Sequence, residues 1–155
     1  MSTVELDAID RKILSVLQHE GRLTNEELSK RVGLSSSPCL RRLKRLETEG
    51  VISRYAAVLD QVKVGLPISV FTQVKVERHG DDVLQKLEEA FRRWPEVMEC
   101  YLMTGPRDYL LRVVVADLPS YERFLKEKLT RLSGVASIES SFALQQVKYG
   151  VGLPL

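Results

Sequence analysis

Residues 35–49 read SSSPCLRRLKRLETE, and this stretch decides the fold of the N-terminal part of the 155-residue chain. Four of the five residues from Arg41 to Arg45 are basic. Because a helix turns by about 100° per residue, the apolar and basic side chains fall on opposite sides of it. The apolar arc holds Cys39, Leu40, Leu43 and Leu46, and the opposite arc holds Arg41, Lys44 and Arg45. The pattern predicts a helix with one face on a core and a positively charged face suited to DNA.

Ser37 is a good N-cap residue and Pro38 suits the first helical position, so this helix is predicted to begin there and to end near Gly50. Serine hydroxyls and backbone N–H groups can reach phosphates or base edges, and an arginine can bond a guanine edge with two hydrogen bonds. The candidate DNA-binding residues are Ser35, Ser36, Ser37, Pro38, Arg41, Arg42, Lys44 and Arg45. Which arginine reads bases stays open, and a charged, solvated helix face is the alternative interpretation.

Two shorter helices are predicted before the basic one. An apolar stripe at helical spacing marks residues 6–19, and a capping box of Thr24 and Glu27 opens a second helix that stops at Gly33. Helix, turn with glycine and basic helix in this order are typical of a helix-turn-helix domain. The β-forming residues 51–59 then predict a short wing strand that leads out of the domain.

The second half of the chain predicts a different architecture. Strands and helices alternate in the order β-α-β-β-α-β, over residues 68–77, 81–94, 97–103, 109–116, 120–132 and 136–148. This order favours a ferredoxin-like antiparallel sheet with two helices on one face. We therefore expect an α+β chain with a winged helix-turn-helix domain at 1–59, a linker at 60–67 and the ferredoxin-like domain at 68–155. We expect its other sheet face to pair with another copy of the chain, because several apolar side chains can supply surface there, namely Val70, Phe71, Val74, Val76, Val113, Val114 and Val115.

Several motifs together resemble the Lrp/AsnC regulators, also called leucine-responsive or feast/famine regulators. LDAIDRKIL, GRLTNEELSKRVGLS and SPCLRRLKRLETEGVI resemble their DNA-binding domain, and GPRDYLLRVVV and SSFALQQVKY resemble their amino-acid-responsive domain. The resemblance implies dimers, commonly assembled into octamers, that bind double-stranded promoter DNA and respond to a small amino acid. The ending SSFALQQVKYGVGLPL is most similar to members that control amino-acid breakdown.

The turn from Thr104 to Tyr109 resembles the effector loop of that family. A zwitterionic amino acid needs donors for its carboxylate, which turn N–H groups or Arg107 could supply, and an acceptor for its ammonium, which Asp108 could supply. The family often shows Gly-Asp-x-Asp-Tyr here, whereas this chain has Pro106 in place of the first Asp. The alternative is a hairpin turn in which Gly, Pro and Asp only shape the backbone.

Other residues match positions that line or support the effector pocket between neighbouring subunits in the family. The complete set of candidate effector-binding residues is Leu102, Met103, Thr104, Gly105, Pro106, Arg107, Asp108, Tyr109, Leu118, Ser140, Ser141, Phe142 and Ala143. We expect no other cofactor.

The composition and the motifs limit the functions that we expect. The net charge is only +2, no apolar run approaches the roughly 20 residues that span a bilayer, and the two cysteines form no zinc-binding pattern. No constellation of catalytic side chains is present, so we expect neither an enzyme nor a metal site. The expected function is a cytoplasmic, nucleoid-associated, sequence-specific transcription regulator of amino-acid metabolism. The alternative is an architectural, nucleoid-type protein with weak sequence preference.

Overall fold

The computed structural model describes residues 4–77, 80–150 and 152–155, and its contacts divide the chain into two compact units. The N-terminal unit contains Met1–Val58 together with the tail Val147–Leu155, and the C-terminal unit is Leu59–Gln146. The contacts of the tail thus group it with the helices, whereas the expected second domain at 68–155 includes it. Its Leu153 exchanges two hydrogen bonds between its backbone and the side-chain amide of Gln18.

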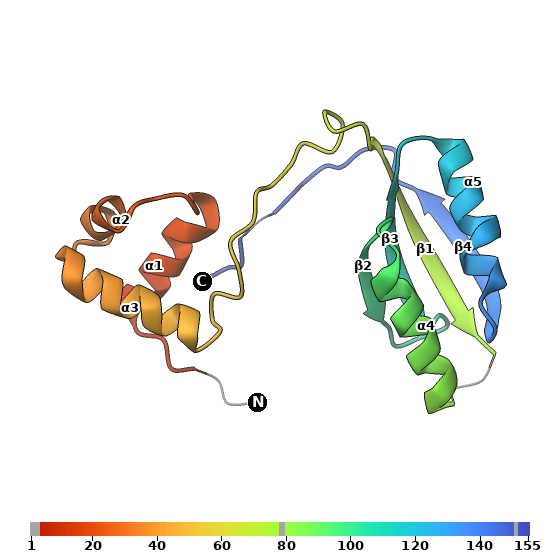
Figure 1. Ribbon diagram of the computed structural model, residues 1–155, viewed down its shortest axis with the longest axis horizontal. Coiled ribbons are helices and arrows are strands. Elements are labelled where there is room, and N and C mark those ends of the chain that lie inside the picture. Colours follow the sequence, from red (N-terminus) through yellow and green to blue (C-terminus); the bar gives the residue numbers. More distant parts are fainter. Residues whose placement is uncertain (1–3, 78–79, 151) are drawn as a thin grey trace. The chain divides into compact units, whose positions relative to one another are not determined.

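Three helices form the N-terminal unit, α1 (Ala8–His19), α2 (Asn25–Val32) and α3 (Ser36–Thr48) (Figure 1). Each supplies buried apolar side chains to one small core. Its fully buried members are Ile13, Leu28, Val32, Cys39 and Leu46. The helices thus pack by the faces that their periodicity predicted.

The ends of two helices differ from the prediction. The N-cap of α3 is Ser35 rather than Ser37, and its side chain makes no capping hydrogen bond. Pro38 consequently lies at the third helical position, where its missing N–H costs no hydrogen bond because the first four donors of a helix have no partner within it. The α1 helix begins at Ala8, after an Asp7 side chain that caps it.

The predicted wing strand at residues 51–59 is wrong, because the structure forms no strand over those residues. The segment is mostly exposed and extended, and within the described part of the chain it has no ladder partner. Strand formation requires such a partner, which local β propensity does not provide. The side chain of Tyr55 donates a hydrogen bond to Glu47, at 2.9 Å, and contacts the helical unit in this way.

The C-terminal unit has the predicted ferredoxin-like order. Its elements are β1 (Ile68–Val76), α4 (Asp81–Arg93), β2 (Val97–Leu102), β3 (Tyr109–Val115), α5 (Leu118–Glu127) with a short 3-10 turn at Leu129–Arg131, and β4 (Val135–Phe142). The strands pair antiparallel in the order β2-β3-β1-β4. Both helices cover the same face of this sheet (Figure 1). The last strand stops at Phe142, because its partner Val70 lies near the start of β1 and little of β1 remains to pair with.

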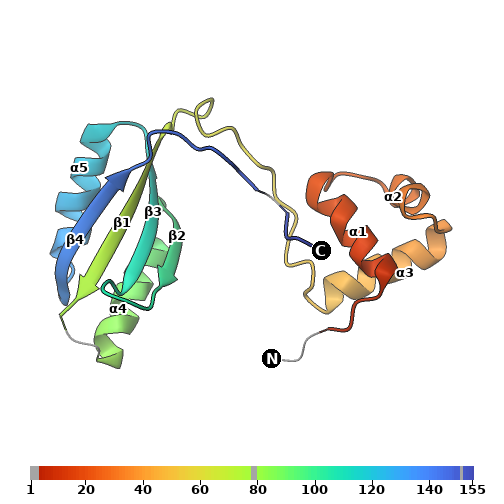
Figure 2. The ribbon, with the colours of Figure 1, turned by 180° about the vertical axis from the view of Figure 1, so that it is seen from behind.

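The covered face contains the core of this unit, and the other face is open (Figure 2). Val70, Val74 and Val113, which we expected to supply an uncovered apolar surface, are buried beneath the helices. The neighbours that alternate with them, such as Phe71 and Arg112, belong to the open face, and Arg112 pairs there with Glu99 at 3.1 Å. Of the expected apolar residues, Phe71 and Val114 belong to the open face, which is therefore less apolar than predicted.

Candidate DNA-binding and ligand-binding sites

The connection between α2 and α3 positions the predicted recognition helix. Gly33 ends α2 in the left-handed conformation, with φ 77°, which favours glycine at this turn. The side-chain amide of Asn25 donates to the backbone oxygen of Ser36, at 2.9 Å. The first turn of α3 is thus attached to the first turn of α2, while the side chains of Ser35, Ser36 and Ser37 remain exposed.

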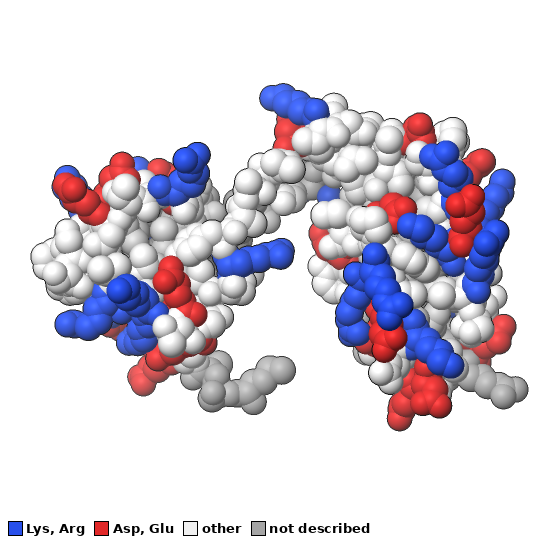
Figure 3. Space-filling model, viewed as in Figure 1, with Lys and Arg blue, Asp and Glu red and all other residues white. Residues whose placement is uncertain are grey.

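Positive charge gathers over α3 on the surface of the N-terminal unit (Figure 3). Ser37, Arg41 and Lys44 are exposed, and their spacing of four and then three residues places them along one side of the helix. Neither Arg41 nor Lys44 has a side-chain partner among the residues that the structure describes. These side chains are available to a ligand that lies along α3.

The other two basic side chains of α3 are used within the domain. Arg42 donates to Asp7 at 2.7 Å and to Asp10 at 2.9 Å, and Arg45 donates to the second oxygen of Asp10 at 2.5 Å. The Asp10 side chain is 1% exposed. The backbone N–H of Asp10, and after it the hydrogen bond from Arg42, lower the pKa of Asp7, and the two aspartates raise the pKa of Arg42. We call these four residues the α1–α3 ion-pair cluster.

Sequence reasoning missed both aspartates of this cluster. The only local signal is their spacing, since Asp7 and Asp10 form a capping box at the start of α1. That pattern indicates a helix start. It contains no information about arginines 32 or 35 residues away.

The candidate effector loop is fastened to the sheet by the two charges that we expected to face a ligand. Asp108 is 7% exposed and accepts the backbone N–H of Val76 at 2.7 Å, with the Lys75 ammonium at 3.5 Å. Arg107 donates to Ser137 and to Glu139, both at 2.7 Å and both on β4. These contacts are internal to the fold, and the expected roles of the two side chains toward a ligand gain no support from them.

The rest of the candidate effector set divides between the two ends of the sheet. Thr104, Gly105 and Pro106 are exposed in the loop that precedes β3, whereas Leu118 follows the far end of that strand. Six residue steps along β3 correspond to about 20 Å. Phe142 on β4 pairs with Val70 on β1, and Val70 pairs with Val113 in the second half of β3, so Phe142 belongs to the far end as well. One copy of the chain does not bring the predicted residues together in a single pocket.

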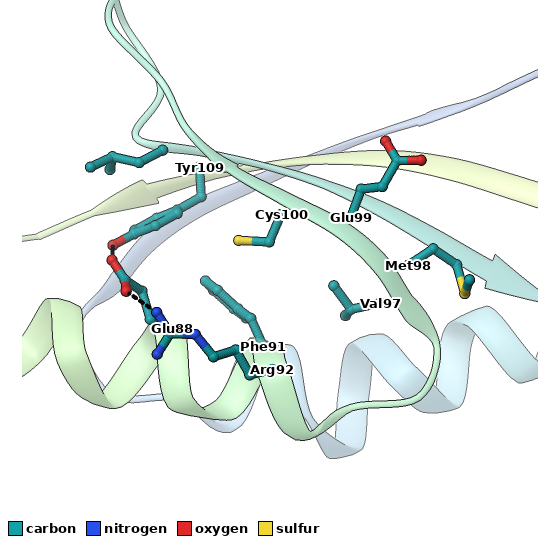
Figure 4. Close-up of a pocket in the computed structure, with 9 residues that line it drawn as sticks. Glu88, Phe91, Arg92, Val97, Met98, Glu99, Cys100 and Tyr109 are labelled. Atoms are coloured by element: carbon teal, nitrogen blue, oxygen red, sulfur yellow. Dashed lines mark hydrogen bonds and ion pairs between the residues drawn. The ribbon is translucent and has the colours of Figure 1, made fainter. Parts of the chain in front are cut away.

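A groove of about 440 Å³ lies between α4 and the edge strand β2 (Figure 4). Its lining includes Leu102 and Tyr109 from the candidate effector set. The other lining residues are Glu88, Phe91, Arg92, Val97, Met98, Glu99 and Cys100. The four-residue spacing of Glu88 and Arg92 is a sequence signal for the helical side of the groove. Alternation does not group the β2 residues, because Val97 to Cys100 are consecutive and the strand has an irregularity between Val97 and Glu99.

The polar groups in this groove bond to one another, and its thiol and phenol stay protonated. Tyr109 donates to Glu88 at 3.2 Å, and Arg92 pairs with the other oxygen of Glu88 at 2.8 Å. Burial and the charge of Glu88 raise the pKa of Tyr109 to about 12 and the pKa of the Cys100 thiol to about 11. At neutral pH both groups are protonated, and a protonated thiol is a poor nucleophile.

No group of three or more His, Cys, Asp and Glu side chains within the described residues is placed to hold a metal ion. No helix in that part of the chain is long and apolar enough to cross a membrane.

The fold and these sites define a helix-turn-helix DNA-binding protein with a second, ferredoxin-like domain. Residues 69–153 match the family model of the Lrp/AsnC ligand binding domain, and residues 6–53 match a winged helix-turn-helix DNA-binding model. The chain is 47% identical over 151 residues to the Bkd operon transcriptional regulator of Pseudomonas aeruginosa, a match that covers 97% of this chain and 99% of that protein. The chain belongs to the Lrp/AsnC family of transcriptional regulators, which are not enzymes.

Other relatives agree with this placement. The leucine-responsive regulatory protein of Escherichia coli is 42% identical over 144 residues, which are 93% of this chain and 88% of that protein. A transcriptional regulator from Neisseria meningitidis, solved in complex with L-methionine, superposes with a TM-score of 0.93 at 44% identity and covers 97% of each chain. An AsnC family regulator from Agrobacterium tumefaciens gives a TM-score of 0.92 at 42% identity, covering 96% of this chain and 97% of its own.

Proposed function

We propose that this protein is a sequence-specific regulator of genes of amino-acid metabolism, and that a small amino acid changes its activity by binding between C-terminal domains of neighbouring copies. The relatives named for a Bkd operon and for leucine response support the metabolic part of the proposal. The neighbour in complex with L-methionine supports a small amino acid as effector. Acting on promoter DNA would place the protein in the cytoplasm, at the nucleoid.

The observation that supports a site between copies is the division of the candidate effector residues. The loop residues and Leu118 lie at opposite ends of β3, so a single ligand can touch both groups only where the ends of two copies meet. The exposed apolar side chains at the two ends are suited to such a meeting. Met103 is 46% exposed and Leu118 is 52% exposed. A dimer, and an octamer built from dimers, would supply this arrangement.

Thermal unfolding in the presence of each of the twenty amino acids tests the effector. The only tryptophan, Trp94, packs against Phe91 and Phe124 in the C-terminal unit and reports its unfolding. A ligand at 100 times its dissociation constant adds about 2.7 kcal/mol of stability. Leu118→Ala should remove the stabilisation by the same amino acid, whereas Leu144→Ala, a fully exposed leucine outside the candidate set, should keep it.

No stabilisation by any amino acid would contradict the effector part of the proposal. Sequence selectivity is tested separately, by competition between a duplex selected by the protein from a randomised pool and a scrambled duplex of the same composition. Equal competition by the two duplexes would favour the architectural, nucleoid-type alternative.

A further inference from the structure

The α1–α3 ion-pair cluster divides the basic side chains of the predicted recognition helix into two pairs. Arg42 and Arg45 both reach α1 and donate to the oxygens of Asp10, although the Arg45 side chain is still 42% exposed. Arg41 and Lys44 are exposed as well, and they differ from Arg42 and Arg45 in having no side-chain partner among the described residues. The four adjacent cations, which look equivalent in the sequence, are therefore not equivalent in the fold.

The Asp10 carboxylate is held in place by more than the two arginines. One of its oxygens accepts the backbone N–H of Asp7 at 3.2 Å, and the backbone N–H of Asp10 in turn donates to the Asp7 side chain at 2.8 Å. The capping box thus fixes the carboxylate at the first turn of α1, and a nearly buried charge holds its partners firmly. This arrangement fixes the orientation of α3 relative to the first turn of α1.

Two arginines held in this way have less freedom to follow a phosphate backbone. A charge that is free to contact phosphates adds affinity for any DNA sequence, and it adds salt dependence with it. A charge that is bonded within the protein adds neither. The cluster would therefore lower non-specific binding while it sets the angle at which α3 enters the groove.

We propose that Asp10 is a positioning residue for sequence recognition, which keeps Arg42 and Arg45 on α1 and leaves Arg41 and Lys44, beside Ser37, to contact DNA. Arg41 is the base-reading arginine in this arrangement, through a guanine edge in the major groove. The inference rests on the proposed sequence-specific function and says which residues perform it.

The test compares matched Arg→Gln variants of the full chain on two duplexes, one selected by the wild-type protein from a randomised pool and one scrambled. Arg41→Gln should lower the ratio of the two affinities at least tenfold. Arg42→Gln should lower the melting temperature of the helical unit and leave that ratio within about threefold of the wild type. An equal loss of the ratio in both variants would overturn the proposal.

Asp10→Asn supplies a second readout, which an effect on folding alone would not produce. The variant removes the charge that holds Arg45 at 2.5 Å and weakens the hold on Arg42, which keeps its bond to Asp7 at 2.7 Å. It should therefore steepen the dependence of log K on log salt for the scrambled duplex, by about 0.9 for each additional phosphate that the protein neutralises. Asp10→Glu, which keeps the charge, should restore much of the wild-type slope. Glu122→Gln makes the same change of net charge in α5 of the other unit and should leave the slope unchanged. An unchanged slope in folded Asp10→Asn would overturn the positioning role.

The outcomes for the wild-type protein distinguish this inference from the proposed function. If the wild-type protein binds the two duplexes equally, sequence-specific regulation fails and the inference fails with it. If the wild-type protein prefers the selected duplex and the variants do not behave as described, only the assignment of Asp10 and Arg41 is wrong.

Discussion

Asp108→Ala is expected to destabilise the C-terminal unit whether or not a ligand is present. The carboxylate is buried and accepts the backbone N–H of Val76 at 2.7 Å, and alanine leaves that donor without its acceptor. The cost of a buried donor left in this way is about 1–3 kcal/mol. For a unit of this size each kcal/mol lowers the melting temperature by about 4–8 °C, so the variant should melt at least about 4 °C below the wild type.

The assay is thermal unfolding followed by Trp94 fluorescence, at one fixed protein concentration because assembly would make the midpoint depend on concentration. Asp108→Asn is the matched control. Its amide oxygen can still accept from Val76, and the negative charge that faces Lys75 at 3.5 Å is lost. The asparagine variant should therefore melt between the wild type and the alanine variant. A melting point of Asp108→Ala within about 2 °C of the wild type would refute this reasoning.

This result also decides how Asp108 variants can be used in ligand screens. A lost response in Asp108→Ala has two explanations, namely a missing ligand contact and a displaced loop. A response that survives in Asp108→Asn but not in Asp108→Ala would indicate the displaced loop.

Three further changes have defined outcomes. Leu46→Ala removes a fully buried side chain from the helical core and should cost about 2–5 kcal/mol, measured by circular dichroism of the N-terminal unit, with loss of DNA binding as α3 loosens. Tyr121→Phe removes the hydroxyl that bonds buried Thr72 at 2.9 Å and should cost about 1–3 kcal/mol by Trp94 fluorescence; an unchanged midpoint would mean that Thr72 finds another partner. Hydrogen bonds from the side chain and backbone of Ser120 lower the pKa of Asp117 below 3.8, its value in the unfolded chain. The ionised carboxylate therefore stabilises the fold above pH 3.8, and this stabilisation is lost as the pH falls through the lowered pKa of the folded state. Asp117→Asn should accordingly show a smaller loss of stability on acidification than the wild type, in the same fluorescence assay.

Elements whose signal is local could be predicted from the sequence. The Thr24 and Glu27 capping box, the apolar stripe of α1 and the alternation in β1 each lie within a few residues, and each element formed as expected. The errors at the start of α3 have a local cause as well. Ser35 and Ser37 are both acceptable N-cap residues, and the choice between them depends on how α3 packs against α2.

Features that depend on distant partners could not be predicted in this way. Alternation shows which residues of β1 share a face, but it does not say which face the helices cover. For this reason Val70 and Val74 were predicted on the open face, whereas they lie in the core beneath the helices. The wing strand failed because a strand needs a neighbour to pair with. The structural roles of Asp10 and Asp108 could not be predicted from the sequence, because their hydrogen-bond partners lie 32 to 35 residues away along the chain.

Both predicted sites show the same relation between charge and function. The sequence places opposite charges beside each functional segment, and in each site the most buried carboxylate, Asp10 or Asp108, fastens that segment to the rest of its unit. A charge that is used to position a segment is no longer free to bind a ligand. The residues that we propose for ligand binding are instead exposed ones, such as Arg41 on α3 and Leu118 at the start of α5. Because a precise contact requires a rigid support, we expect the loss of either fastening carboxylate to impair recognition as much as the loss of an exposed residue that it holds in place.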